Sequence, residues 1–410
     1  MRTLTDDLNI NFSQNVRWSP DGRNVLFFES AATRGAYWLS MISADGGPTK
    51  PLVRDYLGTF SWCEWAPDSK HVIAGAFVDT GVKLLRLNIE SAKIEPLADI
   101  LFAGADFSFS ADARTFAFIS ERPDSPAELW SQVSGGAPRQ ITNLNPQVGA
   151  LHLGSVREIT WTNQRDKQEV HGVLVTPPDF KSGHAYPTIV EPHPGNTAWE
   201  ASWQASWWQW GQLLASNGYV VFLPNPHGVL GRGWKFSELS QNYDDVAYED
   251  MMAGLDSLIA EKIADPNRLG IGGWSNGGYM TARATTRSTR FKAAVMFAAP
   301  VDFPLMWGAS PLRTYFNQVY GPEPTHEQEY EERSPLHFVQ ACKTPTLILQ
   351  GDSDVIVASP QAYEFYHALE SLGVEAELVI YPREGHYIGD RAHQVDFQKR
   401  VLTWFDKHLK

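Results

Sequence analysis

Residues 269–277, LGIGGWSNG, decide the fold of the larger part of this chain. They begin as a short apolar strand, pass through the pentapeptide GWSNG at 273–277, and lead into a segment expected to be helical. The pentapeptide matches Gly-x-Ser-x-Gly in the strand–turn–helix context that a nucleophile elbow requires. The small residues two positions before and after Ser275 let this tight turn close without a steric clash. Because chance alone yields roughly 0.2 such matches in a chain of this composition, the context carries the inference.

Two further polar residues follow predicted apolar strands nearer the C-terminus. Asp354 lies after one of these strands and His386 lies after the next. An α/β-hydrolase places its acid and then its histidine after the serine, at the carboxyl ends of strands. We therefore predict that His386 takes the proton of Ser275 and that Asp354 holds the imidazole in the required tautomer. Asp352 is the rival carboxylate and is expected to face elsewhere.

An oxyanion formed by attack of Ser275 would need two preorganised hydrogen-bond donors. One is the backbone N–H of Asn276, the residue after the nucleophile. The second is expected from the loop at 193–196 (HPGN), which follows an earlier apolar strand. Pro194 has no N–H, so Gly195 is the better donor. The His193 side chain could also donate, or it could have only a structural role.

From about residue 160 onward, short apolar strands alternate with helical stretches. This alternation is typical of a doubly wound, mostly parallel sheet. We therefore predict an α/β-hydrolase catalytic domain over residues 160–410. Its expected strands lie at 188–190, 219–223, 269–271, 292–297, 345–349 and 376–380, and a helix is expected over 245–263.

The first 150 residues instead contain short β-branched and aromatic runs between turn residues. The stretch WSPDG at 18–22 recurs as WAPDS at 65–69 and, in degraded form, as FSADA at 109–113. A strand-rich repeat with a period of ~45 residues is typical of propeller blades. Proline, aspartate and glycine in each repeat supply the tight turn between two blade strands. We therefore predict an all-β partial propeller of about three blades over residues 1–150, in preference to an ordinary β-sandwich.

Composition narrows the possible classes of protein. The 410 residues carry 34 basic and 47 acidic side chains, which argues against nucleic-acid binding because that needs clustered Lys and Arg. Only two cysteines are present, Cys63 and Cys342, so a disulfide framework is excluded and a reducing compartment is favoured. The N-terminus lacks the signal-peptide pattern, and no run is long enough for a membrane span. We therefore expect a cytoplasmic protein without membrane partners and, since no metal-spaced cluster is visible, without a metal or cofactor.

Three segments of the sequence resemble the prolyl oligopeptidase family of serine hydrolases, especially its acylaminoacyl-peptidase-like branch. They are DPNRLGIGGWSNGGYMT at 265–281, GDSD at 351–354 and YPREGH at 381–386. The resemblance covers nearly the whole chain and implies a β-propeller followed by an α/β-hydrolase domain. It also implies cleavage of short peptides, with removal of acylated or free N-terminal residues or dipeptides, and in several members cleavage of esters.

Two loops depart from the pattern of that family. Its His-Gly-Gly-Pro loop is HPGN at 193–196, and its Asn-x-Arg-Gly-Ser segment is NPHGV at 225–229, where His227 replaces an arginine. Both loops border the expected site, so the resemblance leaves the substrate preference open. No segment matches the paired glutamates with which dipeptidyl peptidases hold a substrate amine. This absence argues against a dipeptidyl-peptidase activity.

Five of the 15 tryptophans crowd into residues 199–210. Four of them follow the spacing of one helix face, namely Trp199, Trp203, Trp207 and Trp210. Packing in the core or between domains is the more ordinary explanation. The functional alternative is an aromatic wall for an apolar acyl or side-chain group, with Trp199 as its best candidate. The resemblance adds three substrate-pocket candidates after the elbow helix: Met306, Trp307 and Tyr315.

Together these features predict a serine hydrolase that acts through an acyl-enzyme, most simply a peptidase for short or N-acylated peptides. A carboxylesterase for small acyl esters could use the same triad. A non-catalytic binding protein built on the propeller is the alternative from another class, and the intact triad speaks against it.

The length of the chain adds an expectation about assembly. About 250 of its residues are needed for the hydrolase, which leaves room for three blades, whereas propellers typically close with four to eight. Exposed blade edges need a cover. Either the chain is part of a longer protein or a second chain covers the open edge, and we expect a homodimer or a larger assembly.

Overall fold

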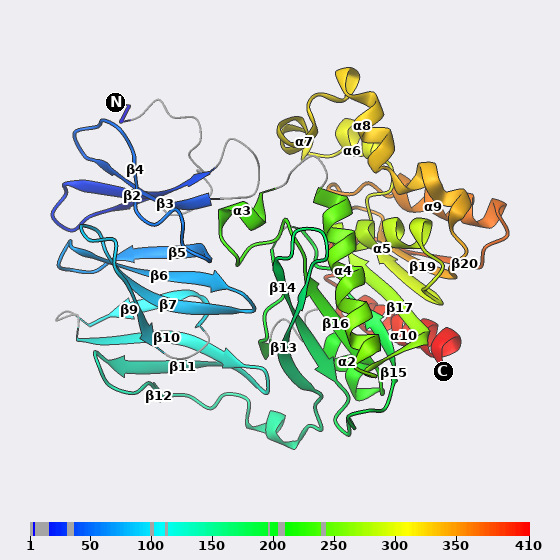
Figure 1. Ribbon diagram of the computed structural model, residues 1–410, viewed down its shortest axis with the longest axis horizontal. Helices are drawn as coiled ribbons and strands as arrows, with labels where there is room; N and C mark the ends of the chain where they lie inside the picture. Colours follow the sequence, from blue (N-terminus) through cyan, green and yellow to red (C-terminus); the bar gives the residue numbers. More distant parts are fainter. Residues whose placement is uncertain are drawn as a thin grey trace. The chain divides into compact units, whose positions relative to one another are not determined.

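The computed structural model describes residues 3–4, 16–30, 37–98, 102–110, 114–195, 197–203, 210–238 and 243–410. The chain divides into two compact units. In Figure 1 the strands β1–β12 of the first unit run from blue to blue-green, and the strands and helices of the second unit run from green to red. The β unit comprises Met1–His152, Glu200–Ser206 and His227–Ser240, and the α/β unit comprises Leu153–Trp199, Trp207–Pro226 and Gln241–Lys410.

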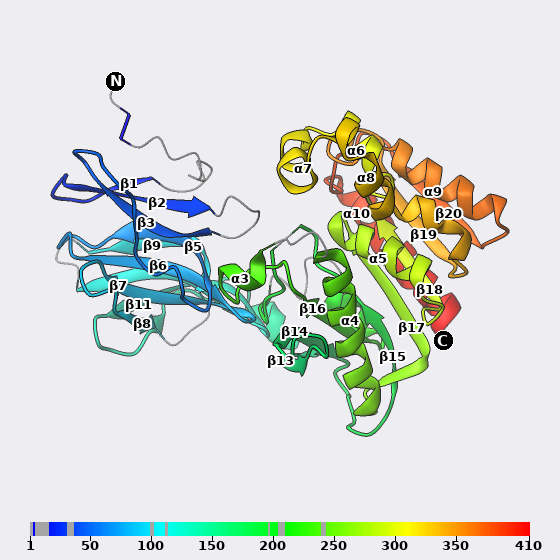
Figure 2. The same cartoon turned by 45° about the horizontal axis from the view of Figure 1, so that its top comes forward.

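Within its described residues, the β unit forms three antiparallel sheets of four strands, each in chain order, which Figure 2 shows from a second side. The first sheet contains β1 (Arg17–Trp18), β2 (Asn24–Ser30), β3 (Tyr37–Ser43) and β4 (Lys50–Pro51). The second contains β5 (Thr59–Trp65), β6 (His71–Val78), β7 (Gly81–Asn88) and β8 (Ile94–Ala98). The third contains β9 (Phe102–Phe109), β10 (Thr115–Arg122), β11 (Ser125–Val133) and β12 (Arg139–Gln140). Four-stranded antiparallel sheets in succession are the form of propeller blades, so the predicted all-β class of this region is confirmed.

The repeated turn joins the first and second strands of a sheet. In the first sheet, Asp21 Oδ1 accepts a hydrogen bond from the backbone N–H of Arg23 at 3.1 Å. In the second, Asp68 Oδ1 accepts from the backbone N–H of Lys70 at 2.9 Å. The aspartate therefore bonds its own backbone two residues on, as an Asx turn requires. In the third repeat, residues 111–113 lie outside the described residues.

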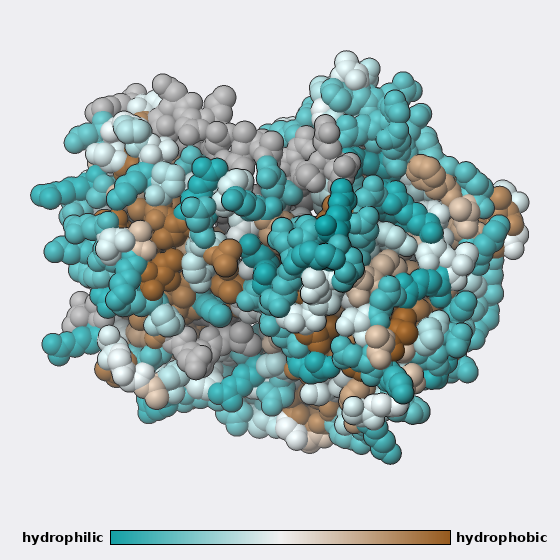
Figure 3. Space-filling model, viewed as in Figure 1, coloured by the Kyte–Doolittle hydropathy of each residue, from teal (hydrophilic) through white to brown (hydrophobic). Residues whose placement is uncertain are grey.

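Apolar side chains hold the sheets of the β unit together. Leu26, Phe28 and Trp65 belong to one buried cluster that spans the first two sheets. Trp62 of the second sheet contacts Phe107 of the third, with ring centroids 5.5 Å apart. Figure 3 also shows apolar side chains on the surface of this unit.

Two short segments from later in the chain complete the β unit. The backbone N–H of Asp79 donates to the carbonyl of Gly231 at 3.0 Å, and Arg232 pairs with the Asp79 carboxylate at 2.8 Å. Ala201 N–H donates to Thr80 O at 2.7 Å. The second segment contains α3 (Trp234–Ser237). The chain therefore passes between the units several times after residue 150, instead of once.

The α/β unit is built on a sheet in the order β13-β14-β16-β15-β17-β18-β19-β20. Its strands are β13 (Ser155–Thr162), β14 (Glu169–Thr176), β15 (Tyr186–Val190), β16 (Val220–Asn225), β17 (Ala264–Trp274), β18 (Ala293–Phe297), β19 (Thr346–Gly351) and β20 (Ala376–Tyr381). The β13–β14 and β14–β16 pairs are antiparallel, and the remaining pairs are parallel. This sheet confirms the predicted α/β-hydrolase class. The β13–β14 hairpin was not among the predicted strands.

Helices cover both faces of this sheet. The described helices of the unit are α2 (Gly211–Ser216), α4 (Tyr243–Ala260), α5 (Asn276–Arg287), α6 (Phe303–Ala309), α7 (Arg313–Tyr320), α8 (Glu327–Arg333), α9 (Pro360–Ser371) and α10 (Arg391–Leu409). Helices α4, α5 and α9 pack against one face of the sheet, and α2 and α10 pack against the other. Short 3₁₀ turns span η1 (Pro146–Ala150), η2 (Glu323–Thr325) and η3 (Pro335–Ala341), of which η1 belongs to the β unit. Among the described helices, none combines the length and the apolar character that a membrane span needs.

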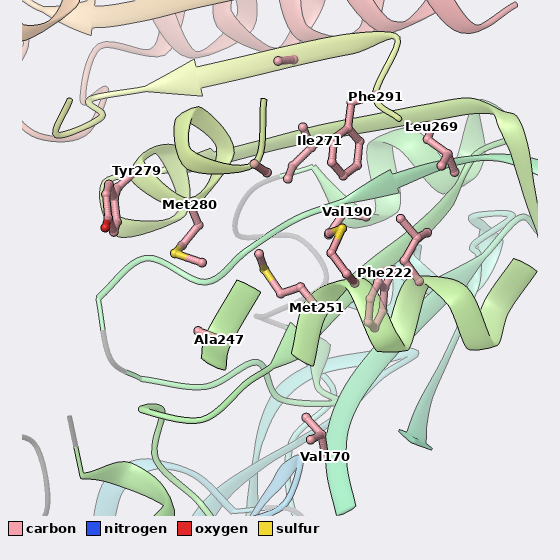
Figure 4. Packing of buried hydrophobic residues seen from close by; sticks show 14 of the residues in the cluster. Val170, Val190, Phe222, Ala247, Met251, Leu269, Ile271, Tyr279, Met280 and Phe291 are labelled. Carbon is pink, nitrogen blue, oxygen red and sulfur yellow. The ribbon is translucent and has the colours of Figure 1, made fainter. Parts of the chain in front are cut away.

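The core between the sheet and the helix α4 fixes the strand that leads to the elbow (Figure 4). Val190 of β15, Phe222 of β16 and Ile271 of β17 are completely buried together with Met251 of α4. Burial of each such side chain stabilises the fold by about 1.5–3 kcal/mol. The central strands are apolar on both faces because helices cover both, which explains their unbroken apolar runs in the sequence.

Candidate active site

Ser275 lies at the sharp turn between β17 and α5. Its φ of +57° is in the left-handed region that side chains other than glycine rarely adopt. The backbone N–H of Ser275 donates to Phe297 O at 2.9 Å, which ties the turn to β18. A Cβ on Gly273 would lie 2.7 Å from Gly277 C, and a Cβ on Gly277 would lie 2.2 Å from Pro192 O. Both glycines of the pentapeptide are therefore required by close backbone approach.

The structure brings together the three residues of the predicted triad. Ser275 follows β17, Asp354 follows β19, and His386 follows β20, so all three lie at carboxyl ends of parallel strands. His386 Nε2 lies 2.9 Å from Ser275 Oγ, and His386 Nδ1 lies 2.8 Å from Asp354 Oδ2. The imidazole thus bridges the hydroxyl and the carboxylate, as a nucleophile–base–acid chain requires.

The Asp354 carboxylate is buried and held by hydrogen bonds from two directions. Its Oδ1 accepts from the backbone N–H groups of Ile356 at 2.8 Å and Val357 at 2.9 Å. Its Oδ2 accepts from Gln350 Nε2 at 3.3 Å in addition to facing His386. These bonds leave the carboxylate little freedom to rotate, so Oδ2 stays directed at the imidazole.

The rival carboxylate of Asp352 has a different set of contacts. Its Oδ1 accepts from the backbone N–H of Arg383 at 2.6 Å and from Ser353 Oγ at 2.8 Å. Arg383 has a φ of +63°, so this bond stabilises a strained turn ahead of His386. Asp352 therefore supports the loop of the histidine, and Asp354 is the carboxylate at the imidazole.

Glu384 organises the same loop, although nothing in its sequence position alone had singled it out. Its buried carboxylate accepts from the backbone N–H groups of Gly389 at 2.7 Å and Asp390 at 3.0 Å, and it pairs with His393 Nδ1 at 2.7 Å. Burial alone would raise the pKa of Glu384, but these hydrogen bonds lower it overall. An ionised carboxylate thus holds the loop on the C-terminal side of His386.

The two residues predicted to bind the oxyanion are neighbours. Gly195 has a φ of +68°, and its carbonyl accepts from Asn276 Nδ2 at 3.2 Å. Tyr243, which the sequence had not singled out, directs its hydroxyl at Asn276 Oδ1 at 3.4 Å. Asn196, the last residue of the predicted loop, lies outside the described residues. The Asn276 side chain therefore links the elbow to the loop of Gly195.

His193 and Trp199 pack together and stabilise that loop. His193 is buried, and its Nδ1–H donates to Pro194 O at 2.5 Å. Burial lowers the pKa of His193 to about 3, so the ring is neutral at physiological pH. The Trp199 ring meets His193 edge-on with centroids 4.5 Å apart, and its indole N–H donates to Glu191 O at 2.9 Å. These contacts give His193 a structural role.

Trp199 is 1% exposed, and both its backbone groups bond to the Asn225 side chain, at 2.6 and 2.9 Å. Trp199 therefore packs against the loop at 193–195, as the packing explanation expected. It does not lie in a helix, so the helical spacing predicted from residue 199 is wrong at its first position. Trp210 is also fully buried, near Phe397 of α10. Trp207 and Trp208 lie outside the described residues.

The three further pocket candidates occupy different environments. Met306 is buried in the core of the α/β unit. Trp307 is partly buried, and its indole N–H donates to Asn317 Oδ1 at 2.7 Å. Tyr315 is 39% exposed. Trp307 and Tyr315 therefore retain surface that a ligand could contact, whereas Met306 is part of the buried core.

Glu191 is buried next to the oxyanion loop, and its carboxyl group has a raised pKa. Burial raises its pKa to about 8, and the nearby Trp210 amide opposes this rise only in part. The group is thus protonated at neutral pH and adds no negative charge beside the expected oxyanion. Among the described residues, no group of three or more His, Cys, Asp or Glu side chains is placed to hold a metal ion.

Residues 201–410 match the prolyl oligopeptidase family, peptidase S9. The uncharacterized peptidase YuxL of Bacillus subtilis is 31% identical over 310 residues, which cover 74% of this chain and 47% of YuxL. Dipeptidyl-peptidase 5 of Porphyromonas gingivalis is 28% identical over 362 residues, which cover 85% of this chain and 52% of that protein. The chain thus spans about half the length of these relatives.

A solved structure agrees with the sequence relatives at the level of fold. The acylaminoacyl peptidase of Pyrococcus horikoshii superposes with a TM-score of 0.82 at 23% identity, over 95% of this chain and 62% of that one. With the family match over half of the chain and the Ser–His–Asp geometry at its elbow, this protein belongs to the prolyl oligopeptidase family.

Proposed function

We propose that the protein is a serine hydrolase that cleaves amide or ester bonds through an acyl-enzyme. Ser275 is the nucleophile, His386 the general base and then general acid, and Asp354 the residue that orients the imidazole. The observation that carries this proposal is the hydrogen-bonded chain from Ser275 Oγ to His386 Nε2 at 2.9 Å and from His386 Nδ1 to Asp354 Oδ2 at 2.8 Å. Its position at a strained elbow, at the carboxyl ends of three strands, supports it further.

In the first half of the reaction, Ser275 Oγ attacks the substrate carbonyl while its proton moves to His386 Nε2. The carbonyl oxygen becomes an oxyanion, which the backbone N–H groups of Asn276 and Gly195 would hold. Preorganised donors of this kind are worth about 10²–10³ in kcat each. The intermediate then collapses to the acyl-enzyme, and His386 returns the proton to the leaving amine or alcohol. Water, activated by the same imidazole, releases the acyl group and regenerates Ser275.

Short or N-acylated peptides are the substrate class that we propose. Two features support it: the family membership of the chain, and a relative named a dipeptidyl-peptidase together with a structural neighbour named an acylaminoacyl peptidase. A carboxylesterase activity on small acyl esters is the second candidate, because amides and esters pass through the same acyl-enzyme. The triad geometry favours neither of the two.

A matched pair of substrates separates these candidates. We expect the purified protein to hydrolyse both the p-nitroanilide and the p-nitrophenyl ester of the same N-acetylated amino acid, because His386 can protonate the amine leaving group. The measurement is kcat/KM for each of these substrates, and for the p-nitroanilide of a dipeptide that has a free N-terminus and ends in the same amino acid. Turnover of the ester with no detectable cleavage of either anilide would contradict the peptidase and favour the esterase.

We also propose that a second copy of the chain packs against exposed strands of the β unit. The first and third of its described sheets carry exposed apolar side chains, which a partner would bury. Trp18 on β1 is 57% exposed and Val133 on β11 is 59% exposed.

Light scattering tests this assembly. We expect a mass of at least twice the 45.8 kDa of one chain, and we expect Trp18→Glu or Val133→Glu to lower that mass because a charge would have to be buried in the contact. Val355→Glu, at an exposed position in the α/β unit, is the control for an added surface charge. An active, stable monomer at micromolar concentration would contradict the proposal.

A further inference from the structure

Trp274 stands directly before the nucleophile, as the last residue of β17. In register, it pairs with Phe297 of β18, and the two rings stack with an interplanar angle of 22° and centroids 6.2 Å apart. Phe297 in turn meets Phe397 of α10 edge-on at 5.0 Å. The indole is therefore fixed to the central strands of the sheet at the place where Ser275 begins its turn.

The same indole reaches across to the loop of the catalytic base. Trp274 Nε1–H donates to the backbone carbonyl of His386 at 2.6 Å. The ring centroids of Trp274 and His386 are 5.2 Å apart, at an angle of 45°. These two residues are 112 positions apart in the sequence, so this is a tertiary link between the elbow and the histidine loop.

A histidine base needs more than partners for its ring nitrogens. The bonds from the His386 ring to Ser275 and Asp354 are both lost if the backbone of His386 shifts, because the ring turns with it. Glu384 holds the loop through the amides of Gly389 and Asp390, which lie three and four residues beyond the histidine. Trp274 instead donates to the carbonyl of the histidine itself, and it is the residue directly before Ser275 in the chain.

We propose that Trp274 is a positioning residue for His386: its indole N–H fixes the backbone of the base at the distance from Ser275 that proton transfer needs. This inference rests on the proposed function. A misplacement of about 1 Å at such a site can cost on the order of 10²-fold in rate. If Trp274 were only a wall for the substrate, its loss would instead raise KM, since ground-state contacts contribute to binding.

The experiment removes the indole N–H and keeps an aromatic ring. Trp274→Phe is one variant, and replacement of Trp274 by 3-benzothienylalanine, which exchanges the N–H for sulfur at nearly constant shape, is the second. We expect both to lower kcat about 10- to 100-fold while KM changes less than about threefold. The rate of phosphonylation by a small fluorophosphonate should fall by a similar factor, because that reaction also needs His386 to remove the Ser275 proton.

Trp161→Phe provides a matched control. Trp161 is buried on the edge strand β13, and its indole N–H likewise donates to a backbone carbonyl, that of Asp250, at 2.8 Å. We expect this variant to lower the melting temperature at least as much as Trp274→Phe, with kcat within about twofold of wild type.

Two results would overturn the positioning role. One is a kcat for the benzothienylalanine variant within twofold of wild type. The other is a loss that falls on KM alone. Either result would leave the proposed function intact, because that function is tested separately by the turnover of the wild type and its loss in Ser275→Ala.

Discussion

Ser275→Ala is expected to abolish hydrolysis, with kcat falling about 10⁶-fold, the scale of nucleophile loss in a serine protease triad. The variant has no hydroxyl to attack the carbonyl, and His386 has no proton to remove. The fold should persist, because the φ of +57° at this position strains alanine no more than serine, and the backbone N–H of residue 275 can still donate to Phe297 O. The measurement is kcat on the matched anilide and ester, together with the thermal melting curve.

Ser371→Ala serves as the matched control for this change. Ser371 lies at the end of α9, where its hydroxyl donates to His367 O, and it is exposed. We expect kcat within about twofold of wild type there. Turnover by purified Ser275→Ala above about one-thousandth of the wild-type rate would contradict the role of Ser275 as nucleophile.

Asp354→Asn is expected to lower kcat about 10⁴-fold, as loss of the orienting carboxylate does in the trypsin-type triad. The surroundings of this residue dictate how an asparagine would sit. Its amide oxygen would face the N–H groups of Ile356 and Val357, which need an acceptor. Its NH₂ would then face His386 Nδ1 and force the tautomer whose Nε2 carries the proton. That nitrogen could no longer accept the proton of Ser275.

Asp352→Asn is the matched control for the acid. An asparagine oxygen at residue 352 can still accept from the N–H of Arg383, so the loop keeps its main support. We expect kcat to fall less than about tenfold, and kcat for both variants should be measured with the same anilide. A large loss in Asp352→Asn with near-normal turnover in Asp354→Asn would reverse the assignment of the acid.

The sequence allowed the catalytic half to be predicted where local pattern and topology agree. Several buried central strands appear as apolar runs, and the order of Ser275, Asp354 and His386 after three successive predicted strands is enough to place them at the carboxyl ends of a parallel sheet. The strand β13 of the β13–β14 hairpin escaped prediction because it is mostly exposed and lacks an apolar run.

The remaining features depend on contacts between distant parts of the chain. Arg232 and Asp79 are 153 positions apart, yet their ion pair joins a segment that follows β16 to the β unit. Tyr243 approaches Asn276 from the start of α4, and nothing in the spacing of these residues predicts that contact. Trp199 shows the opposite case, in which helical spacing suggested two roles and only the tertiary structure reveals its packing against His193.

Active-site labelling followed by peptide mapping tests the central claim most directly. The native protein is treated with a fluorophosphonate, digested and sequenced by mass spectrometry. We predict one adduct per chain, on Ser275, with no adduct in Ser275→Ala and slowed labelling in Asp354→Asn. A folded wild-type protein that takes up no label, or that carries it on another serine, would contradict the account.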